Sequence, residues 1–297
     1  MTARRRFRLR LGSRTLVLGE RTLVMGVLNI TPDSFSDGGL YLDSQAAVAH
    51  AFAMERAGAD LIDIGAESTR PGALPVRPAE QIVHLLPVLK ELRGVLRIPI
   101  SVDTRSAEVA EAAADGGAQI LNDVSALRAE PELAKVAARR SLALILMHMR
   151  GTPATMQRGP FARDAMRDVV TSLRHAVSAA RAAGLSKDRI LLDPGFGFGK
   201  RHAQNFELLA RLPELARLGF PIVIGPSRKS SIGVAQLGKV DAAASGKQQV
   251  PPVNERLWGT AAAVTAAILG GAHIVRVHDI AEMVQVARVA DAVLAGI

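Results

Sequence analysis

The sequence predicts an α/β fold, a (β/α)8 TIM barrel with an N-terminal β-hairpin, as a single domain over residues 1–297. Eight short runs rich in Val, Ile and Leu alternate with longer segments of helical periodicity from residue 24 onward. The runs are apolar almost throughout, which is typical of parallel strands buried on both faces. Glycine follows each helical segment, as it does where helices stop. A doubly wound open sheet is the alternative architecture.

The first element is a hairpin within residues 1–23. Residues 7–23 alternate apolar and polar side chains on both sides of Gly12-Ser13, which predicts two short strands joined by a tight turn. The barrel strands are then expected at Val24–Asn29, Leu61–Ala66, Ile98–Asp103, Ile120–Val124, Leu142–His148, Ile190–Gly195, Pro221–Pro226 and Ile274–Asp279.

The helical segments lie between these strands. The first is expected to begin with Asp43 or Ser44 as its cap and to end before Gly58. The predicted helices are Ser44–Ala57, Ala79–Arg93, Ala107–Ala114, Asp164–Ala183, Asn205–Leu218 and Glu255–Leu269.

Three connections from strand to helix are long, at residues 30–43, 67–78 and 227–254. Loops of that length inside a compact domain are usually functional or disordered. The Ala- and Lys-containing stretch within 227–254 is expected to be mobile.

Composition narrows the class of protein. The chain is 48% hydrophobic and 22% charged, which fits a globular domain with a sizeable core. It contains no cysteine, so disulfides and thiolate metal sites are excluded and a reducing, cytoplasmic location is expected. The basic start is not followed by an apolar signal-peptide core, and no run of 18 apolar residues predicts a membrane span.

The formal net charge is +9, and the sequence pI is about 10.7. Nucleic acid is a partner that such a charge can serve. However, only 3% of residues are aromatic and the Arg residues are dispersed. Small anionic substrates explain the charge as well, and we expect neither nucleic acid nor membrane as a partner.

One stretch points to function directly, the octapeptide Asp193-Pro194-Gly195-Phe196-Gly197-Phe198-Gly199-Lys200. An acid at the end of a buried strand is followed there by three alternating glycines. Such a pattern suits a backbone that approaches a ligand while one carboxylate points into a pocket. A tight turn with a capping acid is the structural alternative.

Polar residues gather where the predicted strands end, which is where a barrel carries its chemistry. Loop residues 68–72 and 227–230 add to them. The strand-end residues are Asn29, Asp103, Asn122, Asp123, His148, Asp193, Arg276 and His278.

This set divides by charge. Asp103, Asn122 and Asp193 offer acceptors and an amide, which suit the donor-rich edge of a planar heterocycle. Arg70, Arg276 and His278 suit an anion such as a phosphate. An Asn29 oxygen could hold Mg²⁺ beside phosphates.

Other polar or large residues have structural interpretations. Asp63 lies in mid-strand and is expected inside the barrel, and Asp123 must point away from the side that Asn122 faces. His148 is as readily structural as functional. The pair Met147 and Met149 is more typical of a core than of a ligand wall, and Trp258 is expected to pack within a helix interface.

The chain resembles the dihydropteroate synthases. The matching motifs cover nearly the whole chain in the family's order, and those at 25–39, 65–72 and 193–200 are the most specific. The others are Val102-Asp103-Thr104, Asn122-Asp123-Val124, Met147-His148-Met149, Ser227-Arg228-Lys229-Ser230 and Arg276-Val277-His278-Asp279.

The resemblance implies a homodimer that condenses 6-hydroxymethyl-7,8-dihydropterin diphosphate with 4-aminobenzoate, with Mg²⁺, and that is a target of sulfonamides. It implies that Asn29 contacts the metal. It assigns the pterin to Asp103, Asn122, Asp193 and Lys229, with Met147 and Phe198 lining the slot. It assigns the diphosphate to Arg70, Arg276 and His278, and the aminobenzoate to Thr69, Pro71, Phe198 and Ser230. Asp103, Lys229, Arg276 and His278 are the residues implied in catalysis.

Two other interpretations are weighed against this one. A pterin-binding methyltransferase shares the barrel and the acids but has no use for Asn29 with Mg²⁺, nor for Arg276 and His278. A catalytically silent pterin-binding paralogue would not need an intact set of Asn29, Thr69, Arg70 and Lys229. The chain departs from the family at Arg105-Ser106, where many bacterial members carry an aromatic residue and a Lys, and in its long 227–254 segment.

Overall fold

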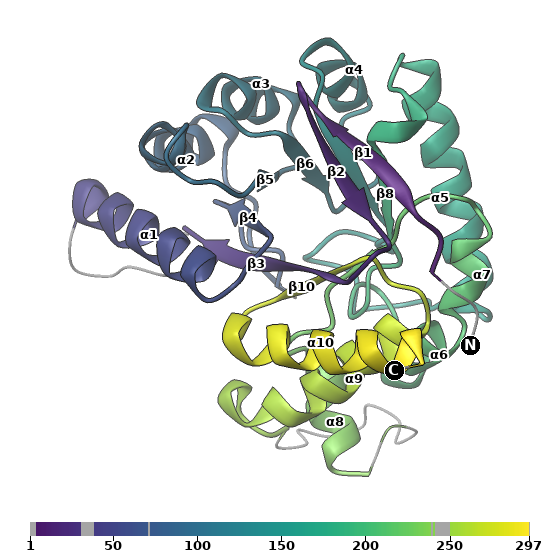
Figure 1. Ribbon diagram of the computed structural model, residues 1–297. Coiled ribbons are helices and arrows are strands. Elements are labelled where there is room, and N and C mark those ends of the chain that lie inside the picture. Colours follow the sequence, from purple (N-terminus) through teal and green to yellow (C-terminus); the bar gives the residue numbers. More distant parts are fainter. Residues whose placement is uncertain (1–3, 31–38, 71, 239, 241–249, 297) are drawn as a thin grey trace.

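The barrel prediction is confirmed. The computed structural model describes residues 4–30, 39–70, 72–238, 240 and 250–296, without the side chains of 39–43. An eight-stranded parallel sheet runs in the order β8-β7-β6-β5-β4-β3-β10-β9, and the bridge between Leu192 and Ile222 joins its two ends (Figure 1). Its strands are β3 (Leu23–Asn29), β4 (Leu61–Gly65), β5 (Ile100–Asp103), β6 (Ile120–Asp123), β7 (Ala143–Met147), β8 (Ile190–Asp193), β9 (Val223–Ile224) and β10 (Ile274–Val277).

The helices surround the barrel, and several differ from the predicted segments. The first helix begins at Gly39, ahead of the expected cap. The predicted helix 205–218 is two helices, because Pro213 opens a new one directly after Arg211. Three helices, α4, α8 and α10, lie outside the predicted segments. The helices are α1 (Gly39–Arg56), α2 (Pro78–Leu92), α3 (Ala107–Gly116), α4 (Glu132–Arg139), α5 (Ala165–Ala182), α6 (His202–Ala210), α7 (Leu212–Ala216), α8 (Ser230–Gln236), α9 (Leu257–Leu269) and α10 (Ile280–Ala295).

The long segment 227–254 is therefore not a loop throughout. It contains α8, and a 3-10 turn, η3 (Val253–Arg256), leads from its end into α9. Residues 239 and 241–249, where mobility is predicted, lie outside the described residues, as does most of the 30–43 connection. None of the helices that the structure describes is long and apolar enough to span a membrane.

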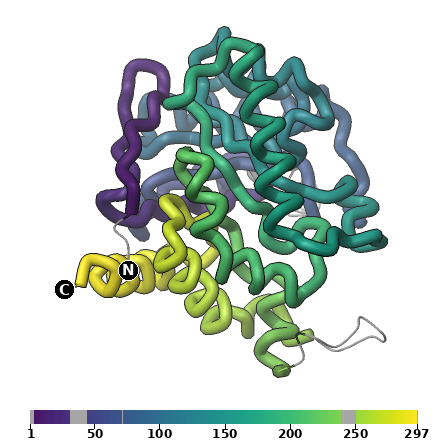
Figure 2. The backbone as a smooth tube through the Cα atoms, turned by 90° about the vertical axis from the view of Figure 1, so that its right-hand side faces the viewer, coloured from purple at the N-terminus to yellow at the C-terminus, as the bar shows by residue number. Residues whose placement is uncertain are grey.

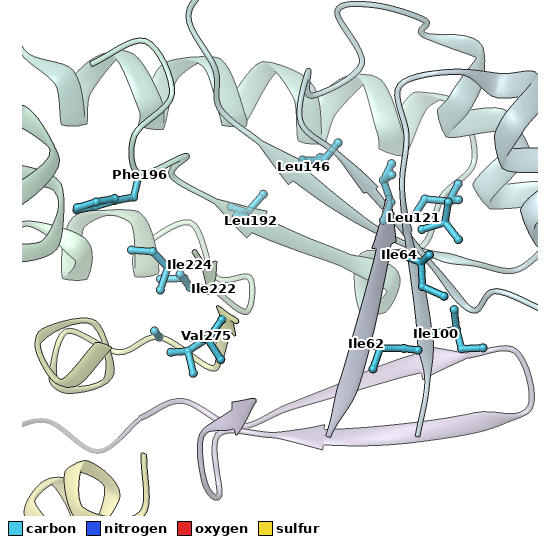
Figure 3. Close-up of a cluster of buried hydrophobic side chains, with 14 of the residues drawn as sticks. Ile62, Ile64, Ile100, Leu121, Leu146, Leu192, Phe196, Ile222, Ile224 and Val275 are labelled. Carbon is cyan, nitrogen blue, oxygen red and sulfur yellow. The ribbon is translucent and has the colours of Figure 1, made fainter. Parts of the chain in front are cut away.

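Most of the core lies between the barrel and its helices. Figure 3 shows its strand side chains, among them Ile62, Ile100 and Leu121, standing on successive strands. Because the strands are covered by helices on one side and fill the barrel on the other, their apolar runs need no polar alternation. This explains why the eight strands can be recognised from the sequence.

The hairpin closes one end of the barrel. Its strands β1 (Phe7–Leu11) and β2 (Arg14–Leu18) pair antiparallel around Gly12-Ser13, as predicted. Leu9, Leu11 and Leu18 are buried in a cluster with residues of most barrel strands, including Met25. Figure 2 shows the hairpin along one edge of the molecule. The opposite, carboxyl-terminal end of the barrel stays free for a site.

The prediction that Trp258 packs within a helix interface is wrong. It stands on α9 with 79% of its surface exposed, so it does not pack between helices. Because α9 is rich in apolar residues, its sequence pattern does not indicate which of them face solvent.

A buried histidine ties the N-terminal segment to the barrel. His273 accepts a hydrogen bond from Ile222 N at Nδ1 (3.1 Å), and its Nε2 donates to the Arg5 carbonyl oxygen (2.9 Å). This arrangement requires the neutral ring. Burial lowers the pKa of His273 to about 4, below the ordinary value of 6.5.

We predict that replacing His273 by Gln flattens the acid side of the stability profile. Between pH 6.5 and about 4 the unfolded chain binds a proton at His273 that the folded chain does not, so the wild-type fold loses stability as pH falls. The loss from this one group is on the order of 1–3 kcal/mol. Urea unfolding of both proteins from pH 7 to 4.5 measures the difference. Parallel profiles would show that His273 is not the group responsible.

Candidate active site

The candidate residues lie at one end of the barrel. In a parallel barrel all strands end on the same face, so residues at their carboxyl ends converge. Asn29, Asp103, Asp193 and Met147 are the last residues of their strands, and Asn122 is the last but one of β6. The structure thus places together what the sequence places at strand ends.

Four polar side chains form a connected network across the barrel. Arg276 Nε donates to Asp63 Oδ2 (2.7 Å), and its Nη2 lies 3.4 Å from Asp103 Oδ2. Asn122 Nδ2 donates to the same oxygen of Asp63 (2.9 Å). Asp63 is fully buried, as the interior prediction requires. It therefore orients two candidate ligand-binding residues, Asn122 and Arg276.

The network leaves acceptors without a donor. Asn122 Oδ1 and Asp63 Oδ1 are buried, and no residue that the structure describes donates to them. A buried acceptor without a donor costs about 1–3 kcal/mol, so such a site favours a ligand that brings N–H groups. This agrees with the heterocycle interpretation.

The two strand-end carboxyls are hard to ionise in the empty site. Burial, together with the nearby charge of Asp63, raises the pKa of Asp103 to about 7, although Arg276 opposes the shift. Burial raises the pKa of Asp193 to about 6, against the hydrogen bond from Gly195 N and the charge of Arg276. A ligand edge that donates hydrogen bonds, or a positive charge on the ligand, stabilises the ionised forms.

The Asp193 octapeptide folds around its own lysine. Lys200 is buried, and its ammonium donates to the carbonyl oxygens of Gly195 (2.8 Å) and Phe198 (2.9 Å) and to His148 Nδ1 (3.0 Å). Gly195 has a φ of 68°, and a Cβ there would lie 1.8 Å from the His148 carbonyl oxygen. Glycine is thus required for this close approach.

His148 belongs to this framework. Its Nε2 lies 3.3 Å from an Asp168 oxygen, and burial followed by the charge of Lys200 lowers its pKa to about 4. The neutral ring therefore accepts from Lys200 and donates to Asp168. The structure favours the structural interpretation of His148, which holds the octapeptide in position.

Lys229 stands over the apolar part of the site. Its ammonium lies 3.9 Å from the centroid of the Phe198 ring, and burial lowers its pKa to about 8. Phe198 and Met147 belong to a small apolar cluster separate from the main core, which also contains Val124, Met149 and Met156. The site thus combines an apolar wall, a cation and two carboxyls.

His278 and Arg70 are candidate anion-binding residues of the site. Ser227 Oγ accepts from His278 N (3.2 Å) and lies 3.0 Å from His278 Nδ1; when the hydroxyl donates to Nδ1, the ring N–H is on Nε2. Burial, followed by the charge of Arg276, lowers the pKa of His278 to about 4, so the ring is a neutral donor. Arg70 is exposed, and no described acid pairs with it.

The partner of the 67–78 loop was not predicted. Arg105, noted only as a departure from the family, donates to both oxygens of Glu67, through Nη2 at 2.7 Å. Glu67 also accepts from Val76 N (3.2 Å), and Gly72 N donates to Pro153 O (3.1 Å). The loop is therefore tied at its base and near its tip, more firmly than its composition suggests.

The remaining predicted residues have simple placements. Asp123 points away from Asn122, as predicted, and accepts from Ser125 N and Leu127 N in the following turn. Thr69 is half-buried and Ser230 is the exposed first residue of α8. Pro71 lies outside the described residues.

Asn29 is the candidate protein ligand for Mg²⁺. Among the described residues no three His, Cys, Asp or Glu side chains cluster as a metal cage. Asn29 is the one exposed residue of β3, and it ends that strand at the site. Mg²⁺ usually takes one or two protein oxygens and completes its shell with water and substrate phosphates. Asn29 fits that mode.

Comparison with known proteins decides the family. The model of the pterin-binding enzymes matches residues 25–278. A dihydropteroate synthase of Synechocystis is 46% identical over 281 residues, which cover 95% of this chain and 91% of the relative. The chain belongs to the dihydropteroate synthase family. It is therefore a transferase of folate biosynthesis that joins a dihydropterin diphosphate to 4-aminobenzoate.

Solved structures of dihydropteroate synthases agree with this barrel. The Yersinia pestis enzyme, in complex with a sulfonamide drug, superposes with a TM-score of 0.86 at 40% identity, over 97% of this chain and all of that one. The Xanthomonas albilineans enzyme, with 4-aminobenzoic acid, gives 0.86 at 41% identity, over 98% and 99% of the two chains. The Escherichia coli dihydropteroate synthase is 43% identical, over 91% of this chain and 90% of its own.

Proposed function

We propose that Asp103, Asn122, Asp193 and Lys229 bind the pterin ring of the dihydropteroate synthase substrate. The observation that carries this assignment is a pair of buried carboxyls with raised pKa values beside an amide oxygen that has no described donor. A pterin presents ring and exocyclic N–H groups along one edge, which these oxygens can accept. Met147 and Phe198 form the apolar wall.

The diphosphate leaving group belongs at the cationic side of the site. Arg70, Arg276 and the N–H of His278 Nε2 can contact its oxygens, and Asn29 would hold Mg²⁺ there. When bound, the metal supplies positive charge against the charge that builds on the leaving group. Arg276 also holds Asp63, so its guanidinium links the pterin pocket to the diphosphate pocket.

The reaction needs stabilisation of charge rather than a nucleophilic side chain. As the C–O bond to diphosphate breaks, positive charge develops on the exocyclic methylene and the electron-rich ring. The carboxylates of Asp103 and Asp193 stabilise that charge electrostatically, in a site largely shielded from water. The aminobenzoate nitrogen then forms the new C–N bond and releases a proton. Thr69, Pro71, Phe198 and Ser230 border its pocket.

One assay tests the activity. The protein with Mg²⁺ and the dihydropterin diphosphate should release diphosphate in proportion to added 4-aminobenzoate, and 7,8-dihydropteroate should form in equal amount. A sulfonamide should compete with 4-aminobenzoate. Release that does not depend on 4-aminobenzoate, or no release from folded protein, would identify a silent pterin-binding relative.

We predict that Arg276→Ala and His278→Ala weaken binding of the diphosphate substrate far more than binding of free 6-hydroxymethylpterin. Each removes a donor to an anion, so a loss of about 10- to 100-fold is expected for the diphosphate ligand. Calorimetric titration of both ligands measures the difference. Arg276→Ala should also lower stability, because it leaves buried Asp63 without its cation. Equal losses for the two ligands would mean that the pair is structural.

We propose that the enzyme is a cytoplasmic homodimer. The absence of cysteine supports the reducing location. Trp258 on α9 and Val289 and Val293 on α10 are exposed, and α9 contacts α10 and α8 on one side of the molecule (Figure 1). An exposed apolar surface of this kind is typical of an interface between proteins.

We predict that Trp258→Ser shifts the protein from dimer toward monomer. Buried Trp residues often dominate the binding energy of an interface, so we expect the dimer dissociation constant to rise at least about tenfold. Sedimentation velocity over a dilution series measures it. Val95→Ser, at an exposed residue after α2, is the control and should leave the dimer intact. A dimer unchanged by Trp258→Ser would place the interface elsewhere.

A further inference from the structure

A second cavity lies at the opposite end of the barrel from the active site. It has a volume of about 340 Å³ and is lined by residues of β1 and the segment before it, of the 3-10 turn η2 (Lys187–Arg189), and of the turn at 219–221 before β9. None of its residues belongs to the candidate active site. Active sites of such barrels lie at the carboxyl-terminal face. The synthase reaction therefore does not account for this cavity at the amino-terminal face.

Two cations converge in this cavity. A Cβ built on Gly219 would lie 3.3 Å from Arg5 Nη1 and 3.7 Å from Lys187 Nζ, so both groups face the same point of the wall. No described acid forms an ion pair with Arg5, Lys187 or the neighbouring Arg8. The one acid of the lining, Asp188, pairs with Arg10 (3.8 Å). The cavity therefore carries uncompensated positive charge, which favours an anion.

Both exposed cations lie beside aromatic rings. The Arg5 guanidinium lies 5.2 Å from the Phe7 ring centroid, and the Lys187 ammonium lies 5.2 Å from that of Phe220. The Arg5 carbonyl is fixed by His273, whose ring meets Phe7 edge-on. Side chains positioned before binding lose less entropy when a ligand arrives.

Part of the wall is apolar. Phe7, Leu9, Phe220 and Pro221 contribute to it, and Leu9, Phe220 and Pro221 are buried. A bare phosphate would use the cations but leave this surface uncovered. Pockets for small organic ligands begin at about 300 Å³ and combine apolar walls with a few polar groups. Aromatic rings also stack on guanidinium planes.

We propose that this cavity binds a small organic phosphate with a planar ring, of the size of a nucleoside monophosphate. The phosphate lies between Arg5 and Lys187, and the ring lies against the apolar wall and the Arg5 guanidinium. The site is independent of the synthase reaction and does not rest on the proposed roles of the active-site residues.

The test is calorimetric titration of AMP into the full-length protein and into two double variants with the same change of charge. Arg5→Gln/Lys187→Gln removes the two converging cations. Lys90→Gln/Arg174→Gln removes two exposed cations, of α2 and α5, that do not line the cavity. We expect the dissociation constant for AMP to rise at least about tenfold in the first variant and to stay unchanged in the second.

Adenosine, ribose 5-phosphate and inorganic phosphate complete the design. Each lacks at least one part of the proposed ligand and should bind more weakly than AMP. Equal AMP affinity in the wild type and in Arg5→Gln/Lys187→Gln would overturn the proposal, and so would inorganic phosphate binding as tightly as AMP. Because diphosphate release is assayed separately, failure of this site and failure of the proposed function can be told apart.

Discussion

Asp193→Asn is expected to abolish useful pterin affinity while the barrel stays folded. Asp193 Oδ1 accepts from Gly195 N (2.7 Å), and no described residue donates to its other oxygen, which remains for the ligand. An amide at this position would turn an NH₂ group toward ligand donors. The expected loss is about 2–4 kcal/mol, or roughly 30- to 1,000-fold in affinity.

The same substitution should not destabilise the protein. Burial raises the pKa of Asp193 to about 6, so above that pH the folded chain carries a charge that its surroundings disfavour. A neutral amide avoids that charge and keeps an oxygen for Gly195 N. At pH 8 we therefore expect an unfolding free energy at least equal to that of the wild type.

Calorimetry with a pterin ligand, alongside thermal unfolding, checks both expectations. Asp115→Asn is the matched control, since Asp115 is an exposed acid at the end of α3 whose partner is Arg140 on the surface. The control should bind pterin normally. Near-native pterin affinity in folded Asp193→Asn would remove Asp193 from the site.

The sequence predicted the barrel because burial on both faces makes its strands apolar throughout. The shortest strand is β9, where only Val223–Ile224 pair between Pro221 and Pro226. Helices were harder to predict. The eight-residue α4 is short for a periodic pattern, and the predicted helix 205–218 did not reveal the break that Pro213 introduces.

The site was predicted through residues at strand ends, and its supporting contacts were not. Pairs such as Arg276 with Asp63, or Lys200 with His148, join residues far apart in the chain. Nothing in the local pattern around either residue indicates its partner. The buried ammonium of Lys200 is the clearest example, because no role was predicted for it within the motif.

The second large effect concerns the order in which the substrates bind. The pterin pocket is built from residues on strands or next to them, so it should exist before any ligand arrives. The proposed aminobenzoate pocket includes Thr69 and Pro71 of the 67–78 loop. Arg70 of the same loop is exposed and lies near enough to lower the pKa of Lys229. Diphosphate bound by Arg70 would therefore fix Thr69 on the second pocket.

We expect 4-aminobenzoate and sulfonamides to bind appreciably only when pterin, diphosphate and Mg²⁺ are present. We infer that Thr69 and Arg70, between the ties at Glu67 and Gly72, adopt the competent arrangement only as a minor population in the empty enzyme, and that the first ligand removes this penalty. Titration of a sulfonamide into the empty protein and into the protein with those three ligands measures the coupling. Equal affinity in both would place the aminobenzoate pocket on the rigid barrel rim.

Arg105 provides the structural control for this account. Its bidentate pair with Glu67 ties the base of the 67–78 loop to the turn after β5, without contact to the pterin residues other than through charge. Arg105→Ala should therefore weaken sulfonamide binding to the protein with pterin, diphosphate and Mg²⁺ by about tenfold, because a partly buried ion pair is lost. Pterin affinity should stay nearly unchanged. Arg105→Lys should recover part of the loss, because it restores one cation to the Glu67 carboxylate. That carboxylate also keeps its hydrogen bond from Val76 N. A loss of pterin affinity equal to the loss for the sulfonamide would show that Arg105 acts on the whole rim, and that the loop does not assemble the second pocket separately.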